Sequence, residues 1–264
     1  MSDIYEFWNR AACGEELLLR SLDTLGYESQ RTERYRLEPY IPGFAGFARC
    51  KGLKVLEIGV GLGAEHPSFA EGHADLHGVD LTPRAIEHTR RRLELFGLTS
   101  QLSVSDAEVL PFPNATFDLV YSWGVLHHCA DTPQTFREVL RVLKPGGTAR
   151  IMIYSKWSLV GLMLWIRYAL LRGRPLMTLQ EIYGKYLESP GTKAYTVAEA
   201  RNMCAGFSDV RIDTVLTHGD LLESNAGQRH KGLLLSLARR LWPRWLFRTC
   251  LPKHGLFMLI ECKR

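Results

Sequence analysis

A glycine-rich turn is the first place where this sequence could do chemistry. The run VLEIGVGLG covers residues 55–63 and places Gly59, Gly61 and Gly63 directly after an apolar stretch. Glycine permits a sharp turn from strand to helix and lets a ligand approach the backbone closely. Because Gly59, Gly61 and Ala64 also satisfy the dinucleotide pattern G-x-G-x-x-G/A, the turn predicts a nucleotide-like ligand without naming it.

Acidic residues follow the expected strands at positions where such a ligand would meet them. Asp80 ends the second strand, where a carboxylate can bind ribose hydroxyls. Asp106 and Ala107 follow the third strand, where an acid and free amides could bind an adenine amino group and ring nitrogen. Glu57 precedes Gly59 by two residues, and its carboxylate favours a ligand with positive charge over a pyrophosphate. It could hold an ammonium group or an ordered water.

Two adjacent histidines, His127 and His128, are the leading candidates for a general base. They follow the fourth expected strand, at the carboxyl end of a parallel sheet, where ligands bind in open α/β folds. The alternative is that one of them bonds to the backbone and shapes the loop. Tyr154 ends the fifth strand and could contact the acceptor or belong to the core. The residues that could form an aromatic wall around a cationic ligand, or simply pack in the core, are Trp8, Tyr35 and Trp123.

Strands alternate with helices from residue 52 to residue 154, which predicts a doubly wound parallel sheet. Short helices are expected before it, at 3–10 and 15–25, and prolines and glycines are expected to break up the stretch RTERYRLEPYIPGF. The five expected strands are LKVLEIGV, DLHGVDL, QLSVSD, FDLVYSW and TARIMIYS. After an insert, the pattern resumes with a helix at 196–205 and the strands DVRIDTVL and GLFMLIECKR.

Residues 52–154 resemble class I S-adenosylmethionine-dependent methyltransferases, and among them the branch with ubiquinone and menaquinone biosynthesis methyltransferases. The resemblance rests on VLEIGVGLG, GVDLTPRAIE, DAEVLPFPNATFDLV, LHH and RVLKPGG, and the terminal GLFMLIECK resembles the last strand of that fold. It implies an α/β, doubly wound, seven-stranded Rossmann-like methyltransferase sheet of order 3-2-1-4-5-7-6. The last strand would be antiparallel, and helical N-terminal and cap inserts would surround the sheet.

The resemblance also implies S-adenosyl-L-methionine as the cofactor. The residues implied in the first cofactor motif are Glu57, Gly59, Gly61 and Gly63. Asp80 would bind the ribose hydroxyls, Leu81 would pack beside the adenine, and Asp106 with Ala107 would face the adenine edge. Ser122, Trp123 and Gly124 would line the site near the sulfonium, and His127 is the histidine that usually follows in this group.

The same features divide the chain into four expected parts. Residues 1–50 form an N-terminal helical lid and residues 51–155 the S-adenosylmethionine-binding core. Residues 156–195 form a cap insert, and residues 196–264 complete the core around a basic helical insert at about 219–252. The resemblance is weak in the lid and the inserts, which are the parts where this fold varies to make a substrate pocket.

The composition of the chain limits the classes of protein to which it can belong. An apolar fraction of 46% is enough for a full core, and none of the six cysteines forms a C-x-x-C pair, so neither a zinc site nor a disulfide framework is expected. The first residues lack the apolar segment of a secretory signal, and the run at 157–171 is shorter than the ~20 residues that cross a bilayer. We therefore expect a reduced, cytoplasmic protein.

The net charge of +5 is unevenly distributed. Nine Lys and Arg residues lie between positions 228 and 264 against one acid, Glu261. This basic segment could be a solvated face, or it could join the apolar helix at 157–171 in a membrane-surface contact. We favour a cap over an apolar pocket for that helix, and membrane contact as the alternative.

These expectations converge on an enzyme that methylates a small, apolar or aromatic metabolite by in-line displacement. The alternatives are a membrane-surface methyltransferase for a lipid or quinone and a non-catalytic module that binds the cofactor or a partner. Nucleic acid is disfavoured as the acceptor, because SWGV stands where a loop of the N-P-P-Y type would follow the fourth strand. A protein acceptor stays open, as do the acceptor atom and the oligomeric state.

Overall fold

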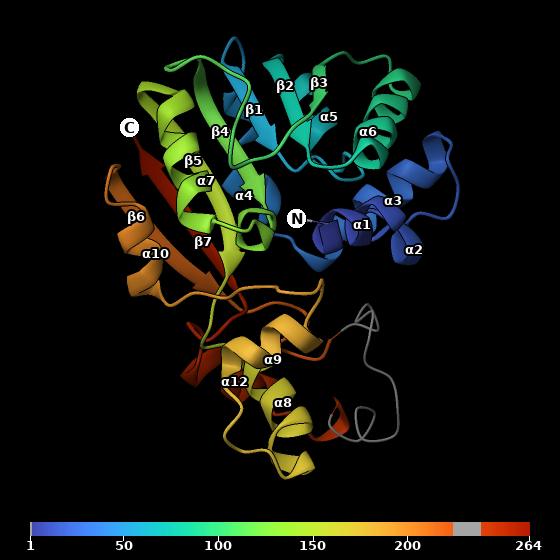
Figure 1. Cartoon of the computed structure of the whole chain (residues 1–264). Helices are drawn as coiled ribbons and strands as arrows, with labels where there is room; N and C mark the ends of the chain where they lie inside the picture. Colours follow the sequence, from blue (N-terminus) through green and yellow to red (C-terminus); the bar gives the residue numbers. More distant parts are fainter. Residues whose placement is uncertain (1, 224–238) are drawn as a thin grey trace.

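The computed structural model describes residues 2–223 and 239–264, and a seven-stranded sheet forms its centre (Figure 1). The strand order is β3-β2-β1-β4-β5-β7-β6. Strands β1 to β5 pair in parallel, and β7 runs antiparallel between β5 and β6. The predicted order and the reversed last strand are thus confirmed. The strands are β1 Lys54–Ile58, β2 Asp75–Asp80, β3 Gln101–Val104, β4 Phe117–Trp123, β5 Leu143–Tyr154, β6 Ser208–Val215 and β7 Phe257–Lys263.

Two apolar clusters cover the two faces of the sheet. Val55 and Leu56 are neighbours in β1 but belong to different clusters, because successive side chains of a strand point to opposite faces. One cluster contains residues of α7 (Thr132–Val142) and α10 (Val197–Met203). The other contains residues of α4 (Ile41–Ala45) and α5 (His66–Glu71), whose Phe69 ring lies 5.3 Å from that of Tyr121. Helix α6 (Pro83–Leu95) contacts β2 and β3.

Side-chain caps fix where the core helices begin, and with them the loops that carry polar residues. The Thr82 hydroxyl accepts from the Ala85 amide at the start of α6, and the Asp131 carboxylate accepts from the Gln134 amide at the start of α7. Each cap satisfies one of the amides that a helix start leaves without a partner. The loops after β2 and β4 therefore enter their helices at defined residues.

The N-terminal helices differ from the sequence-based prediction. Helices α1 (Ser2–Arg10) and α2 (Glu15–Leu18) are short, and the helix predicted over residues 15–25 is wrong at residues 19–23, which are not helical. Helix α3 (Thr24–Leu37) instead runs through the first half of the stretch RTERYRLEPYIPGF and ends before its first proline. Its start is capped by Asp23, and the first proline comes at position 39, after the helix has ended.

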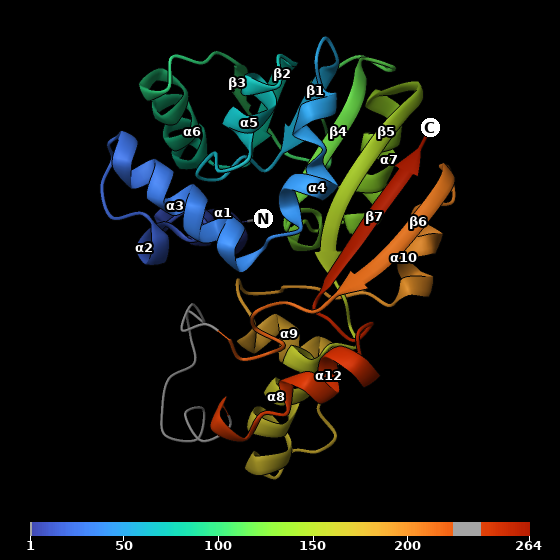
Figure 2. The same cartoon turned by 180° about the vertical axis from the view of Figure 1, so that it is seen from behind.

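A second body lies below the carboxyl ends of the strands (Figures 1 and 2). It contains α8 (Leu159–Tyr168), the short helix η3 (Leu170–Arg172), α9 (Leu179–Tyr186) and α12 (Arg244–Cys250), and we call these elements the cap. In the basic segment, the sequence spacing places Leu233, Leu234, Leu237, Leu241 and Trp245 near one helical stripe, and the first three of these residues lie outside the described residues. In the part of the chain that the structure describes, no helix is both long and apolar enough to span a membrane.

One buried carboxylate joins the cap to the sheet. Asp220 accepts hydrogen bonds from the amides of Val160 (3.0 Å), Thr217 (2.9 Å) and Leu256 (2.8 Å). These residues belong to the start of α8, to the loop after β6 and to the approach to β7. The Asp220 carbonyl also accepts from the indole nitrogen of Trp242 at 2.9 Å. The two inserts are therefore held by the same residue.

Candidate active site

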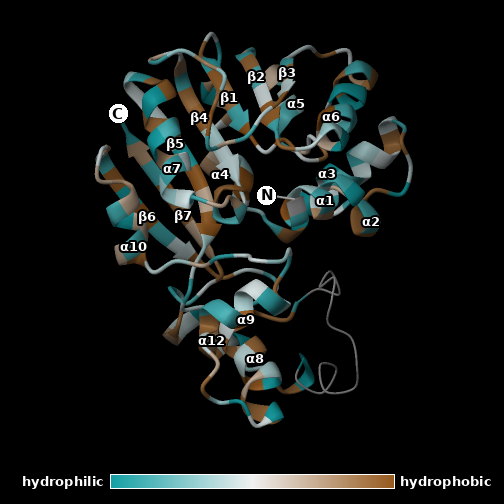
Figure 3. Ribbon diagram, viewed as in Figure 1, coloured by the Kyte–Doolittle hydropathy of each residue, from teal (hydrophilic) through white to brown (hydrophobic). Residues whose placement is uncertain are grey.

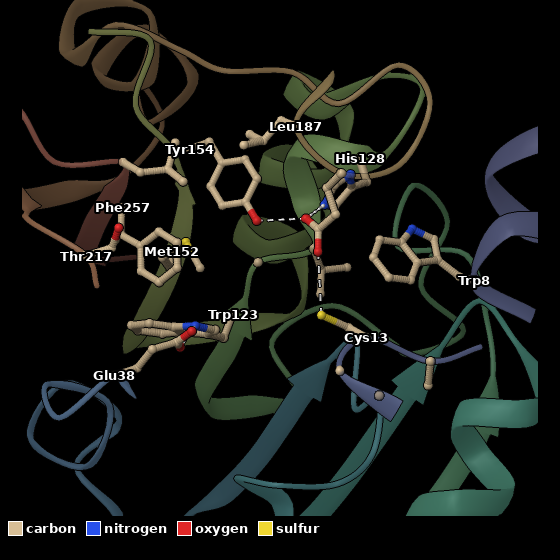
Figure 4. Close-up of a pocket in the computed structure, with 18 of the residues that line it drawn as sticks. Trp8, Cys13, Glu38, Trp123, His128, Met152, Tyr154, Leu187, Thr217 and Phe257 are labelled. Carbon is tan, nitrogen blue, oxygen red and sulfur yellow. Dashed lines mark hydrogen bonds and ion pairs between the residues drawn. The ribbon is translucent and has the colours of Figure 1, made fainter. Parts of the chain in front are cut away.

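A cavity of about 680 Å³ lies where the strands end, between the sheet, the N-terminal helices and the cap (Figure 4). Its volume is in the range of small-molecule sites. Near β1 and β2 it is lined by Gly59, Gly61 and Asp80, and we call this part the glycine end. Beyond Tyr154 it continues to residues such as Leu164, and we call that part the cap end.

The glycine turn keeps its backbone open to the cavity. Gly59, Gly61 and Gly63 have φ values of 82°, 54° and 66°, which side chains with a Cβ rarely adopt. A Cβ at Gly59 would lie 2.1 Å from a methyl group of Val125, whereas a Cβ at Gly61 would meet nothing within 4 Å. Gly61 thus borders empty space in the cavity, where a ligand can approach the bare backbone.

Asp80 and Asp106 line the glycine end and also fix its loops. The Asp80 carboxylate accepts from the amides of Gly61 (3.1 Å) and Thr82 (3.0 Å). Burial raises the pKa of Asp80, and these amides oppose the rise. The Asp106 carboxylate accepts from the Glu108 amide at 2.9 Å. The arrangement holds two acids at the ends of neighbouring strands.

Opposite charges from the N-terminal helices face the same end of the cavity. The Arg34 Nε lies 2.5 Å from Glu65 Oε1, and Arg34 also lies 3.9 Å from Glu38 Oε2. All three side chains line the cavity. Burial raises the pKa of Glu38, which Arg34 counteracts. The glycine end therefore offers both a cation and carboxylates to a bound ligand.

A glutamate from the cap forms the polar centre of the cap end. Glu188 Oε2 accepts from the Tyr154 hydroxyl at 2.7 Å and lies 3.4 Å from Nε2 of His128. Glu188 Oε1 accepts from the Cys13 thiol at 3.6 Å. The other ring nitrogen of His128 lies 2.9 Å from the Ser189 hydroxyl. Figure 4 shows Cys13, His128 and Tyr154 converging on one point in the cavity.

These contacts set the protonation of the cluster. Burial acts to raise the pKa of Glu188, but His128 and the hydrogen bonds from Tyr154 and Cys13 outweigh it and leave the pKa lowered. Burial and the charge of Glu188 together raise the pKa of Tyr154 well above its ordinary value. Burial does the same to the pKa of the Cys13 thiol. Near neutral pH the carboxylate is therefore ionised, while the hydroxyl and the thiol stay protonated and donate to it.

Aromatic rings enclose the space between the two ends. The Trp123 indole donates to Glu38 Oε2 at 3.0 Å, and its ring lies 5.8 Å from that of Phe257. Phe257 stacks on Tyr154 at 5.8 Å, and Trp8 lies 5.5 Å from His128 (Figure 4). Rings of this kind exclude water and attract cations to their faces. Tyr35, which was expected beside Trp8 and Trp123, bonds instead to Ser68 and is not among the lining residues.

Most of the residues predicted for the site line this cavity. Those that line it are Gly59, Gly61, Asp80, Leu81, Asp106, Ala107, Trp123, His128 and Tyr154. The structure does not bring Glu57, Gly63, Ser122 or His127 to the cavity. Ser122 is fully buried, and its hydroxyl donates to the Ile58 carbonyl at 3.0 Å, so it joins β4 to β1 behind the site.

Two of these residues need a correction. Glu57 was predicted beside a ligand's ammonium group, but its carboxylate is buried behind the turn, lies 2.7 Å from His66 Nδ1 and does not line the cavity. His127 is fully buried against the rings of His128 and Tyr154, and neither of its ring nitrogens has a hydrogen-bond partner among the described residues. Of the two candidate bases, His128 lines the cavity and His127 does not.

Sequence reasoning missed the charged residues that come from outside the core. Arg34 and Glu38 are four residues apart, a spacing that pairs opposite charges on a helix, but the helix itself was not predicted there. Cys13 and Glu188 belong to no motif. Their partnership across 175 positions exists only in the fold. Among the described residues, no group of three or more His, Cys, Asp or Glu could hold a metal ion.

Residues 56–151 match the family model described as a methyltransferase domain. The chain contains a methyltransferase domain. It is 30% identical over 200 residues to phosphoethanolamine N-methyltransferase 1 of Triticum aestivum, an alignment that covers 70% of this chain and 40% of that protein. It is 30% identical over 152 residues to the demethylmenaquinone methyltransferase of Tropheryma whipplei, an alignment that covers 56% of this chain and 62% of that protein. The predicted resemblance to S-adenosylmethionine-dependent methyltransferases is confirmed.

The fold of the methyltransferase domain also matches a solved structure. Phosphoethanolamine N-methyltransferase 2 of Haemonchus contortus, solved with phosphomonomethylethanolamine and S-adenosylhomocysteine, has a TM-score of 0.62 and 18% identity. The match covers 99% of this chain and 60% of that one. The chain thus spans less than two thirds of the length of these relatives.

Proposed function

We propose that the chain transfers a methyl group from S-adenosylmethionine to a small molecule held at the cap end of the cavity. The observation that carries this proposal is the continuity of the cavity. Its glycine end has a bare backbone turn and two acids, its cap end has an ionised carboxylate with a histidine, and aromatic rings join the two. Donor and acceptor can therefore meet in one enclosed space.

The glycine end fits S-adenosylmethionine in three respects. The empty space beside Gly61 admits a ligand against the backbone. Asp80 presents a carboxylate that suits ribose hydroxyls, and Asp106 with Ala107 would face the adenine. Arg34 and Glu65 present opposite charges, which suit the carboxylate and ammonium groups of an amino acid. When bound, the cofactor supplies an electrophilic methyl group on a sulfonium.

The cap end would position the acceptor and take its proton. Tyr154 and Glu188 provide a donor and an acceptor of hydrogen bonds that can orient a polar group. The coupled pair of Glu188 and His128 can receive the proton that the acceptor loses. Such a site makes two contributions. It orients the acceptor atom at ~3–3.5 Å from the methyl carbon. It also removes a proton from the acceptor, which is worth ~10²–10⁴-fold in rate. Trp123 and Phe257 would keep water away from the reacting atoms.

The acceptor we infer is a small molecule with a polar group that loses a proton and with an apolar or aromatic body. Beyond Glu188 the cavity is lined by apolar side chains such as Met163, Leu164 and Leu187. The relatives' names give an amine, phosphoethanolamine, and a quinone, demethylmenaquinone, as acceptors. The apolar lining of the cap end favours an acceptor with an apolar or aromatic portion, such as a quinone, over a small polar amine.

Binding and labelling together test the proposal. The purified chain should bind S-adenosylhomocysteine in calorimetry and should transfer label from methyl-labelled S-adenosylmethionine to one component of a fractionated extract of its native cells. Label in the aqueous fraction would indicate a water-soluble acceptor, and label in the organic fraction a quinone or lipid. Absence of S-adenosylhomocysteine binding would overturn the proposal. Binding without label in any fraction would favour a non-catalytic module.

A further inference from the structure

Hydrophobic residues are frequent in α8 and α12 of the cap (Figure 3), and several of their side chains are exposed. On α8 and η3 they are Leu162, Ile166, Leu170 and Leu171, and beside and within α12 they include Leu241 and Trp245. We call these six residues the cap patch. Leu171 is 68% exposed and Trp245 is 71% exposed. Single exposed apolar residues are ordinary, but several on neighbouring elements indicate a surface that contacts an apolar phase or a partner.

The cap patch is continuous with the cavity. Ile166 and Leu171 belong to the patch and also line the cavity. Trp242, which follows Leu241 directly, lines the cavity as well. The cap end of the cavity therefore reaches the molecular surface among the residues of the patch.

Positive charge accompanies the patch. Exposed arginines at positions 172, 174 and 240 belong to the same elements or their flanks. Residues 239–253 contain five Lys or Arg and no acid. The acids of the two inserts are engaged elsewhere: Glu188 in the cavity, Glu181 in the capping box of α9, Asp220 with backbone amides and Glu223 with Arg248. The patch therefore combines apolar and cationic side chains, as surfaces that bind anionic bilayers do.

We propose that the cap patch docks on the surface of a bilayer that contains anionic phospholipids. Apolar side chains of α8 and α12 would enter the headgroup region while the arginines meet the phosphates. A second copy of the chain is a poorer partner, because it would bring two arginine-bearing surfaces together. On the proposed function, the docked cavity would open toward the lipid and admit a lipid-soluble acceptor, whereas docking itself does not depend on that function.

Vesicle flotation of the full chain tests the docking. The protein is mixed at low salt with vesicles of phosphatidylcholine alone or with roughly a third phosphatidylglycerol. We expect flotation with the anionic vesicles, weaker flotation with neutral ones, and loss of binding as salt is raised. The double variants Leu171→Glu/Trp245→Glu and Arg172→Glu/Arg174→Glu should each weaken binding, by about fivefold or more for each reversed arginine.

A matched control separates docking from general surface effects. Val109 is 74% exposed in the loop between β3 and β4, so Val109→Glu replaces one exposed apolar side chain by a carboxylate, as each of the two substitutions in Leu171→Glu/Trp245→Glu does, but on a surface outside the cap. It should float like the unmodified chain. Circular dichroism and S-adenosylhomocysteine binding check that every variant is folded. The proposal is overturned if the unmodified chain does not float with anionic vesicles, if Val109→Glu reduces flotation as much as the patch variants, or if sedimentation shows a dimer that only the patch variants dissociate.

Discussion

Two glutamate–histidine pairs, one behind the glycine turn and one facing the cavity, differ in the protonation of their carboxyl groups. Behind the glycine turn, Glu57 lies 2.7 Å from His66. Burial raises the pKa of Glu57 well above its ordinary value and lowers the pKa of His66 to about 3. At the cap end, Glu188 lies 3.4 Å from His128 and has a lowered pKa. The first pair is neutral, and the second contains a charged carboxylate.

The difference follows from the number of donors that reach each carboxylate. Glu188 receives hydrogen bonds from Tyr154 and Cys13 in addition to its contact with His128. Among the described hydrogen bonds, those of the Glu57 carboxylate are confined to His66. Burial penalises a charge unless enough polar partners compensate, so the same two residue types give a neutral structural link in one place and a charged group in the other.

Replacing the two glutamates should separate these roles most strongly. Glu188→Gln removes the charge that faces the cavity, and we expect the rate of methyl transfer to fall ~10²–10⁴-fold. Glu57→Gln is the matched control, because Glu57 is already neutral, and it should leave the rate close to that of the unmodified chain. Initial rates with the labelled acceptor fraction measure both, and S-adenosylhomocysteine affinity should be unchanged in both. A rate loss in Glu57→Gln equal to that in Glu188→Gln would contradict this assignment.

Substitution of a glycine tests the glycine end of the cavity separately from the cap end. Gly61→Ala places a methyl group in the space beside the turn, and we expect S-adenosylhomocysteine to bind about tenfold more weakly or worse. Gly97→Ala is the control, since Gly97 also has a positive φ, of 65°, and a Cβ there would meet nothing within 4 Å, but it follows α6 away from the cavity. Both should lose ~1–2 kcal/mol of stability, and calorimetry should find weaker binding in Gly61→Ala alone.

The neutral pair should be visible in the pH dependence of stability. Because the folded pKa of His66 lies near 3 and its ordinary value is 6.5, the unfolded chain binds one more proton between these values. The contribution of His66 to the free energy of unfolding should therefore fall as pH drops below 6.5, by up to ~1.4 kcal/mol per pH unit, whereas the raised pKa of Glu57 contributes with the opposite sign in this range. Because His66→Gln removes only the first contribution, urea denaturation between pH 7 and pH 5 should show a less positive slope of unfolding free energy against pH in His66→Gln than in the unmodified chain. An unchanged slope would mean that His66 is charged in the fold.

Of the substitutions predicted here, His127→Phe should have the smallest effect, and its neighbour His128 provides the contrast. His127→Phe removes two buried nitrogens that lack described partners, so we expect the stability to stay the same or rise by about 1 kcal/mol, with methyl transfer retained. His128→Phe should lose transfer, because it removes the partner of Glu188. Thermal denaturation and the labelling assay measure the two properties. Loss of transfer in His127→Phe with normal folding would return the catalytic role to that residue.

Features that depend on residues close together in the sequence could be predicted, and features that depend on contacts between distant segments could not. Gly59, Gly61 and Asp80 lie in short motifs next to strands, so their positions at the strand ends followed from the local pattern. The strand order came from the resemblance of those motifs as a set. Glu57 lies in the same motif, but its burial against His66 depends on how α5 packs, which the spacing does not contain.

The acceptor end could not be predicted in this way. Its polar centre joins Cys13 from the N-terminal segment, His128 after β4 and Glu188 from the cap. Each is an ordinary polar residue in its own neighbourhood, and its chemistry arises from partners brought together by the fold. The long helix α3 was missed for a related reason: its many polar residues weaken the apolar pattern, and its ion pairs with the loop after β1 appear only in three dimensions.

Asp220 has a consequence for how this protein could be re-engineered. Its carboxylate accepts hydrogen bonds from the first insert, at Val160, and from the approach to the last strand, at Leu256, while its carbonyl accepts from Trp242 in the second insert. A chimera that exchanged either insert alone would leave a buried acid with unmatched neighbours. To change acceptor preference, both inserts, including Asp220, should therefore be exchanged together. This holds even though a helix and a strand of the core separate the two inserts in the chain.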